Sequence, residues 1–503
     1  MKNLRSIFFK EENMKKGIFV RVISAFLLLA LLSALLIACA DDSKASENET
    51  SEQTAASEAP EEGGIPEDAL PEELNFNRTF KILGNENRKL QYYNDGSTES
   101  NTIGMVIYER NMTVEERLGV ELSWTFLAGE GNDIPNFINR IRATSEAGDA
   151  FDGVVAYNLV PQIVASEGLA ANLYHTEYID LSAPWWPGVY TREMIVNDQL
   201  YCLVESGSYG LLNHMMAMYF NNEMLESRHL QSPYELLTNN EWTVGKLKEM
   251  IKETYEDKDN DSKVSDGDIF GYCTGTKSKM DCWFFGLGNQ FAKVQDDEVI
   301  SLLDGDHIGK FVDTMVDFFE GDDAYHYDST QFKMFKEKRA YFYCSSVMLS
   351  EQLAAVPDTT YDYGVVPMPK MDSSQERYYT HVANCHDTWC VPYNVKDMDC
   401  TSAVIECMAS EALRQIDPYY FETYVKIRTA PDERLAGMYD LIRDSVTFDF
   451  TYLFSRVYSS MPGNLVKNCY LNPEKNQWST VYAGKKLELD ASFAEIVKTF
   501  ENK

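Results

Sequence analysis

Apolar and polar residues follow two different periods along the first part of the folded chain, and each period predicts an element. Residues 78–84 and 120–124 alternate as strands do. Residues 103–118 and 134–147 carry apolar side chains at helical spacing, and each run is closed by a nearby glycine, which commonly ends a helix. Residues 151–155 form a short apolar run typical of a buried strand. Strands that alternate with helices predict a parallel α/β layer.

The N-terminus has the organisation of a secretory signal. A basic start near Met14 is followed by an apolar stretch, and the sequence Leu-Ile-Ala, with the small residue Ala38 last, leads directly to Cys39. This ending resembles a bacterial lipobox, in which the cysteine is diacylated and the chain is cut before it; two acyl chains are enough for stable anchoring. We therefore expect a signal peptide over residues 1–38 and a lipid anchor at Cys39, on the extracellular face of the cell membrane. The alternative is an uncleaved signal anchor.

Residues 39–75 are dense in Glu, Asp, Ser and Ala and contain no aromatic residue. Such a segment cannot bury enough apolar surface to offset the entropy lost on ordering, and its like charges keep it extended. It is predicted to be an acidic linker behind the lipid anchor. The remaining stretch of about 430 residues is too long for one core and suits two lobes.

The net charge and the cysteines narrow the functional class of the protein further. The formal net charge of −34 excludes nucleic acid as a partner, because phosphate binding needs basic surface. Nine cysteines follow Cys39, and their odd number and irregular spacing predict thiols used as small buried hydrophobes. The disulfide pattern among them is left open.

Several segments, in order, resemble the extracellular solute-binding proteins of the maltose-binding-like superfamily. They read YERNMTVEERLGVEL, FDGVVAYN, GLAANLYHTEYIDLSAPWW, MAMYFNNEML, EWTVGKLKEM, KRAYFYCSSVMLSEQL and YDYGVVPMPK. The resemblance implies an α/β, two-lobed periplasmic-binding-protein-like fold of class II type, with hinge crossovers and a ligand cleft between the lobes. We expect lobe 1 over residues 76–206 and 368–415 and lobe 2 over 207–367 and 416–503. The crossovers are expected near residues 205–210, 364–370 and 411–418.

The ligand-binding candidates follow from the expected ends of strands, since ligands of open α/β sheets bind beyond the carboxyl ends. Aromatic rings can stack on the apolar face of a sugar, and Asn, Asp, Ser and His can pair with its hydroxyls. Trp283 is the preferred stacking ring, whereas the tryptophans at 185, 186 and 389 have packing of the core as an alternative role. The full candidate set is Tyr157, Asn158, Trp185, Trp186, Tyr209, Trp283, Ser345, His381, Asn384, Asp387 and Trp389.

Two further patterns have residue types that bind metals. Residues 257–268 place oxygen donors as an EF-hand calcium loop does, at Asp257, Asp259, Asp261, Ser265 and Asp268, but without the central glycine and the final glutamate. The two hypotheses for this loop are a structural calcium site and a solvated acidic turn. The run from His381 to Cys390, with Cys385 and His386, has residue types for zinc or a Cys-His pair, although the resemblance places an ordinary loop there.

The predicted function is capture of a carbohydrate, an oligosaccharide, by the solute-binding subunit of an ABC importer, with delivery to membrane permease subunits. No cofactor is required for this role, and the protein is not expected to be an enzyme. The alternatives are a binding protein for peptide or another non-sugar solute, a sensor partner, and a surface glycoside hydrolase, which would need paired carboxylates. The sequence contains none of the nucleophile-elbow, zinc-protease or phosphate-loop motifs.

Overall fold

The computed structural model describes residues 65–97, 102–275, 278–326, 330–355, 361–429, 433–458, 461–475 and 477–501. All of them belong to one compact unit, Gly64–Lys503. The predicted signal peptide and Cys39 lie outside the described residues, as does most of the predicted linker.

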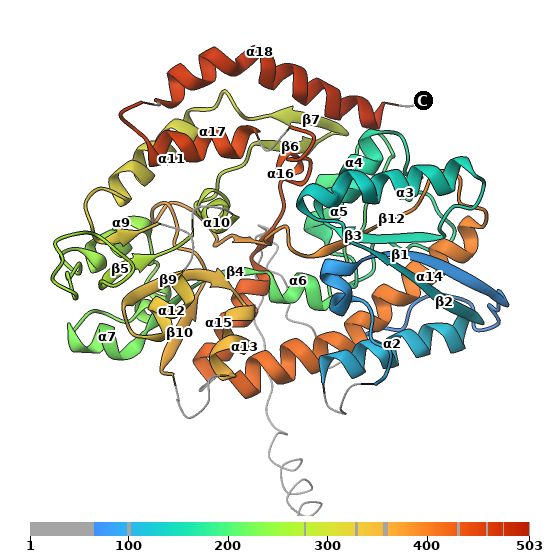
Figure 1. Ribbon diagram of the computed structural model, residues 1–503, viewed down its shortest axis with the longest axis horizontal. Helices are drawn as coiled ribbons and strands as arrows, with labels where there is room; N and C mark the ends of the chain where they lie inside the picture. Colours follow the sequence, from blue (N-terminus) through green and yellow to red (C-terminus); the bar gives the residue numbers. More distant parts are fainter. Residues whose placement is uncertain are drawn as a thin grey trace, which may run out of the picture. The chain divides into compact units, whose positions relative to one another are not determined.

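The first main sheet contains the three strands predicted from the alternating runs and the short apolar run, together with a fourth strand from later in the chain. β1 pairs in parallel with both β2 and β3, and β12, from much later in the chain, pairs antiparallel with β3, which gives the order β12-β3-β1-β2 (Figure 1). The predicted parallel layer is therefore confirmed. Its elements are β1 (Arg78–Asn85), η1 (Glu86–Gln91), α2 (Ile103–Leu118), β2 (Val120–Leu127), η2 (Gly131–Asp133), α3 (Ile134–Glu146), β3 (Gly153–Tyr157), α4 (Leu159–Ser166), α5 (Gly188–Met194), β12 (Asp387–Cys390) and α14 (Met398–Glu411).

Local sequence signals explain the bounds of the helix α2. The side-chain oxygen of Thr102 accepts the backbone N–H of Met105, which satisfies one of the free donors at the helix start. The helix ends at Gly119, whose φ of 61° lies in the left-handed region that glycine adopts without strain. The apolar face of α2 includes Ile107 and Val114, both fully buried in the core against the sheet.

The second main sheet has the order β10-β4-β9-β5-β8, so that β9 is its central strand (Figure 1). Every residue of β9 is buried, which agrees with the apolar run of its first five residues, and the burial extends to the two serines that end the strand. Its elements are β4 (Met216–Asn221), α7 (Asn222–Ser227), α8 (Pro233–Thr238), α9 (Val244–Ile251), β5 (Phe270–Cys273), α10 (Ser278–Gly286), α11 (Asp306–Phe318), β8 (Ala324–Tyr325), α12 (Gln331–Lys336), β9 (Ala340–Ser346), α13 (Met348–Ala354) and β10 (Tyr363–Val366).

Three segments connect the two sheets. The short helix α6 (Tyr209–Asn213) precedes β4, and β11 (Thr380–His381) lies between β10 and β12. The helix α14 continues into the π-helical segments η3 (Ala412–Ile416) and η4 (Pro418–Thr429), after which α15 (Glu433–Asp444) packs on β10. The expected crossovers at 205–210 and 411–418 fall at or beside α6 and η3. Residues 364–370 instead belong to β10 and to a stretch whose Lys370 pairs with the backbone of Trp242 and Val244, so this crossover was expected too early in the chain.

The C-terminal part of the chain contacts both groups of elements. The helix α18 packs against α11 and α17, whereas η5, which directly follows α18, packs against α4 (Figure 1). The carbonyl oxygen of Phe500 accepts hydrogen bonds from the side-chain amides of Asn197 (3.1 Å) and Gln199 (3.0 Å). The elements are β6 (Ala292–Gln295), β7 (Glu298–Ser301), β13 (Val446–Thr447), α16 (Phe450–Leu453), α17 (Met461–Leu471), α18 (Trp478–Val497) and η5 (Lys498–Phe500). The predicted lobe boundaries assign the whole C-terminal segment to lobe 2 and do not anticipate the contact of η5 with α4. We call α18 and η5 together the C-terminal strap.

The predicted acidic linker ends earlier than residue 75. The carboxylate of Asp68 is buried and bonds to Arg117 at 2.6 Å and to Arg414 at 3.0 Å, while the nearby Leu70 joins the core. The prediction over residues 39–75 is therefore wrong for the described residues from 65 onward. The acidic composition predicted a solvated segment. Composition alone cannot reveal that two arginines, one from α2 and one from η3, pair with one of these carboxylates.

Candidate functional site

A cavity of about 180 Å³ lies between the end of the first sheet and the C-terminal helices. The elements around the first main sheet contribute the residue that ends β3, the start of α4 and the loop before β12. The opposite side of the cavity is formed by α10 of the second lobe and by α16, α17 and their neighbours from the C-terminal part of the chain. The lining residues are Tyr157, Leu159, Asp281, Phe291, Asn384, Cys385, Thr451, Tyr452, Ser455, Pro462, Gly463, Asn464 and Lys467.

An ion pair forms the charged part of the cavity wall. Lys467 Nζ lies 2.9 Å from the carboxylate of Asp281, and the hydroxyl of Tyr452 donates to the same carboxylate at 3.1 Å. Burial raises the pKa of Asp281, while Lys467 and the two hydrogen bonds act to lower it. Because carboxylate and ammonium are both only slightly exposed, they can offer a ligand an acceptor and donors with little competition from water.

Hydrogen bonds fix the part of the wall that comes from the first sheet. The side-chain amide of Asn158 donates to Asn384 at 2.8 Å, and the hydroxyl of Thr388 donates to Asn158 at 2.8 Å. The backbone N–H of Asn158 also donates to the carbonyl of His386 at 2.9 Å. The loop that carries Asn384 and Cys385 is thereby tied to the end of β3, which holds Tyr157 at the cavity.

The structure places two of the predicted ligand residues, Tyr157 and Asn384, on the cavity wall. Asn158 is fully buried directly behind Asn384. The ring of His381 stacks on Phe285 at 4.8 Å and meets Tyr452 edge-on at 4.7 Å, so it supports a wall residue and does not line the cavity itself.

The four predicted tryptophans require a correction, since none of them lines the cavity. Trp185 and Trp186 are buried, and their indole N–H groups donate to one carboxylate, Glu406, at 2.8 and 3.0 Å. These two rings anchor the loop after α4 to α14, which is the packing role given above as the alternative to ligand binding.

Trp283 and Trp389 are both fully buried. Trp283 Nε1 donates to the hydroxyl of Tyr272 at 2.7 Å, and Trp389 Nε1 donates to Glu205 at 2.6 Å. With no exposed ring face, neither can stack on a sugar in this conformation. Trp283 was the preferred stacking candidate because its segment resembles one near the ligand cleft of the family, but its ring packs in the core, 4.8 Å from the ring of Phe318.

Three other candidates also lie away from the cavity. The hydroxyl of Tyr209 donates to Glu351 at 3.4 Å beside the first connecting segment. Ser345 is buried within β9, where it pairs with Ala217 of β4. Asp387 is buried at the start of β12; burial raises the pKa of its carboxyl well above the usual range, and its backbone N–H donates to Gln91 at 3.0 Å.

Sequence reasoning missed most of the second half of the wall. Phe291, Tyr452, Asn464 and Lys467 come from segments without a strand end to mark them, and the quoted motifs of the family resemblance stop before residue 371. Asp281 stands two residues before Trp283, so the right segment was recognised but the wrong side chain was chosen. On α10 the helical period turns these two side chains to different faces.

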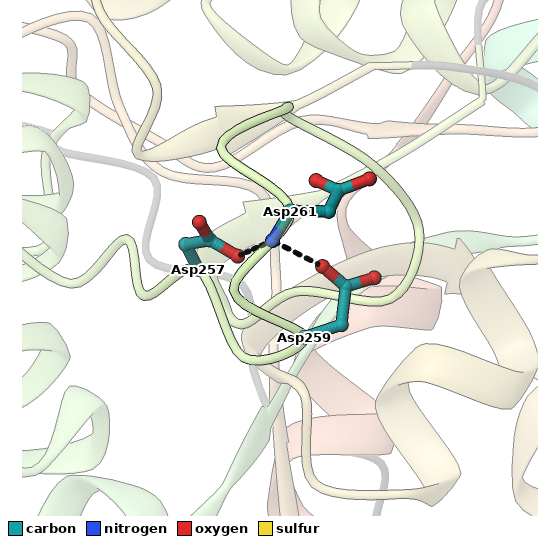
Figure 2. A group of neighbouring side chains, drawn as sticks. All are labelled: Asp257, Asp259 and Asp261. Atoms are coloured by element: carbon teal, nitrogen blue, oxygen red, sulfur yellow. Dashed lines mark hydrogen bonds between the residues drawn. The ribbon is translucent and has the colours of Figure 1, made fainter.

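The calcium-loop candidates lie in the loop between α9 and β5 (Figure 2). Asp257, Asp259 and Asp261 bring carboxylate oxygens within 4.8 Å of one another, and the backbone N–H of Asp261 donates to both of the other carboxylates at 3.2 Å. Asp268 is fully buried, and its carboxylate accepts the backbone N–H groups of Lys258 (3.1 Å) and Ser265 (2.9 Å).

The donor set of this loop fits a calcium ion in kind, because calcium prefers carboxylate and carbonyl oxygens. Ser262, in the place of the usual glycine, adopts a φ of 61°. Calcium binding stays a prediction. Within the described residues, His381, Cys385, His386 and Cys390 do not form a group that could hold a metal ion.

Two sheets with their covering helices, joined by three connecting segments and with a cavity between their elements, define a two-lobed fold of the periplasmic-binding-protein type. The structure is similar to the extracellular solute-binding protein from Staphylococcus aureus in complex with maltose (TM-score 0.54, 11% identity, covering 84% of this chain and 98% of that chain). It is also similar to the cyclic alpha-maltosyl-1,6-maltose binding protein from Arthrobacter globiformis (0.53, 12%, 84% and 99%). A third is the galacto-N-biose-/lacto-N-biose I-binding protein of the ABC transporter from Bifidobacterium longum (0.52, 10%, 84% and 97%).

These similarities confirm the predicted fold class. No protein-family model and no curated protein sequence matches the chain. Among the residues that the structure describes, no helix is both long enough and apolar enough to cross a membrane.

Proposed function

We propose that this protein is the solute-binding subunit of an ABC importer, that it captures an oligosaccharide in the cavity between its lobes, and that it delivers this ligand to a membrane permease. In this proposal the protein is not an enzyme, and Cys39 holds it by a lipid anchor on the extracellular face of the membrane. The fold and the sugar ligands named for the similar structures support the proposal.

The observation that carries the proposal is the composition of the cavity wall. The rings of Tyr157 and Tyr452 line the cavity and are only partly buried, so they can offer apolar faces to a pyranose, whereas Phe291 is stacked on Phe284 and closes the wall behind them. Asn384 and the Asp281–Lys467 pair offer donors and acceptors at the same surface, and sugar hydroxyls need both. A lining of apolar rings and a few fixed polar groups is typical of a small-molecule binding site, although the volume of about 180 Å³ is below the roughly 300–1,000 Å³ of such sites, so an oligosaccharide requires the cavity to widen.

The wall favours binding over hydrolysis. A glycoside hydrolase acts with two carboxyl groups that flank the scissile bond. Among the described residues that line the cavity, Asp281 is the only carboxylate, and it is paired with Lys467. A second carboxylate that could act as acid, base or nucleophile is therefore missing from this wall.

Closure of the lobes around the ligand would exclude water and complete the contacts from both sides. We infer that rotation takes place about the three connecting segments, of which the π-helical stretch after α14 is the longest. Irregular helical turns of this kind are often found at functional positions.

A thermal-shift screen against mono- and oligosaccharides, peptides and metal ions tests the proposal. A ligand at a hundred times its Kd should add about 2.7 kcal/mol to the stability of the folded state, a shift of several degrees. Stabilisation by oligosaccharides, with no release of sugar over hours, supports capture. Stabilisation by peptides alone would keep the fold and contradict the proposed ligand, and turnover of a glycan would contradict the binding role.

A further inference from the structure

Two buried cysteines of the second sheet region face each other. Cys282 lies on α10 and Cys344 on the central strand β9, and their Sγ atoms are 2.9 Å apart. Both residues are fully buried. Sulfur atoms at this distance are closer than an ordinary non-bonded contact, and the two side chains already point at one another. No other two cysteine sulfurs of the described part of the chain make such a contact.

The surroundings of the pair decide when it can react. The Cys282 thiol also contacts the carbonyl of Lys279 at 2.8 Å, and Cys344 Sγ lies 3.8 Å from the sulfur of Met368. Burial raises the pKa of the Cys282 thiol well above its usual range, so it remains a thiol in the folded protein. Since the thiolate is the reactive form, oxidation needs the chain to be folding or locally open.

We propose that Cys282 and Cys344 form an intramolecular disulfide when the protein folds in an oxidising compartment. The oxidant is an external disulfide, either a small molecule or a protein. The thiolate of one cysteine attacks a sulfur of that disulfide and releases a thiolate, which leaves a mixed disulfide. The thiolate of the other cysteine then attacks the protein sulfur of the mixed disulfide and releases the second thiolate. Two electrons pass to the external disulfide, and the two protons of the cysteines end on the released thiols.

This cross-link has a consequence for the cavity. The residue before Cys282 is Asp281, the carboxylate of the cavity wall, which Lys467 pairs with at 2.9 Å. A Cys282–Cys344 bond attaches α10 to the central strand of the second sheet and so fixes the backbone beside Asp281. It also closes a long loop of the chain, which restricts the unfolded state and stabilises the folded one.

The other cysteines serve as internal controls. Cys202 and Cys407 are equally buried but make no sulfur–sulfur contact among the described residues. A serine at either position removes a thiol without touching the pair, whereas Cys344→Ser leaves Cys282 without its partner.

The test begins with unfolding the purified protein and refolding it in a mixture of reduced and oxidised glutathione. Free thiols are then blocked with an alkylating agent under denaturing conditions, and the peptides are mapped by mass spectrometry. We expect a linked pair of peptides containing Cys282 and Cys344 that separates on reduction, persists in Cys202→Ser and disappears in Cys344→Ser. The oxidised protein should also melt several degrees above the reduced one, with no such difference in Cys344→Ser. Full alkylation of both cysteines, or links from either to other cysteines, would overturn the inference. Neither result depends on which ligand the cavity binds.

Discussion

The C-terminal strap offers the sharpest test of how the two lobes are held, through the substitution Phe500→Ala. The ring of Phe500 is fully buried and contacts Tyr201 at 5.5 Å, Phe450 at 5.5 Å and Phe454 at 5.7 Å between ring centroids. It therefore packs against one residue of the first lobe and two of the segment around α16. Removing the ring leaves a cavity that the surrounding side chains can only partly fill.

The magnitude follows from this burial. Phe→Ala substitutions in protein cores cost about 3–5 kcal/mol of stability. We expect part of this loss to appear as local undocking of η5, so the global loss should be about 3 kcal/mol. The two hydrogen bonds to the Phe500 carbonyl involve the backbone and remain possible, so they do not add to the loss while the strap is docked.

The assay combines urea unfolding with small-angle X-ray scattering of the ligand-free protein. We expect Phe500→Ala to lower the unfolding free energy and to raise the radius of gyration, because the strap no longer restrains the lobes. Leu487→Ala on α18 is the matched control: Leu487 is 87% exposed, so its loss should change neither quantity. If Phe500→Ala behaves like Leu487→Ala in both measurements, the strap does not restrain the lobes and the reasoning is wrong.

Three further predictions concern charges. Asp68→Asn should lower stability by about 3 kcal/mol in urea unfolding, because it leaves Arg117 and Arg414 without their shared buried partner; a loss no larger than that of an exposed carboxylate would contradict this pairing. Burial raises the pKa values of Glu193 and Glu406 to about 7, above their unfolded values. At these two sites the folded state thus holds more protons, and their contribution to stability should fall as the pH rises from 6 to 8, whereas His214, His381 and His386, whose pKa values burial lowers, act in the opposite direction. Urea unfolding at both pH values should therefore show the fall as a difference between the natural protein and Glu406→Gln, and an equal pH dependence of the two proteins would refute it. Calcium should raise the melting temperature of chelator-treated protein, and Asp259→Asn should remove this shift; calorimetry without heat of binding would end the calcium hypothesis.

The sequence predicted the elements of the first lobe well because local signals define them. Thr102 and Gly119 mark the ends of α2, and the bounds of that helix are those predicted. The alternation of residues 78–84 likewise predicted β1. The order of family-like segments was enough for the two-lobed fold, since it depends on many positions and not on any single one.

The site was harder to predict because its wall is assembled from distant segments. Tyr157 and Asn384 could be found, since each stands next to a predicted strand. Lys467 meets Asp281 across most of the second lobe's sequence, and nothing local at either residue indicates that contact. Aromatic residues were a poor guide to the site, because a tryptophan in the sequence can either stack on a sugar or pack in the core. Trp283 and Trp389 are both in the core.

The central claim is that the cavity binds an oligosaccharide, and titration calorimetry with two tyrosine variants tests it most directly. Tyr157 lines the cavity, whereas Tyr393 is a 51% exposed tyrosine of the same lobe that does not. The account predicts that the best oligosaccharide of the screen binds the natural protein, binds Tyr393→Ala equally well, and binds Tyr157→Ala roughly fivefold more weakly, since one stacking ring contributes about 1 kcal/mol. Equal affinity for all three proteins would place the sugar elsewhere, and no binding by the natural protein across the panel would contradict the claim itself.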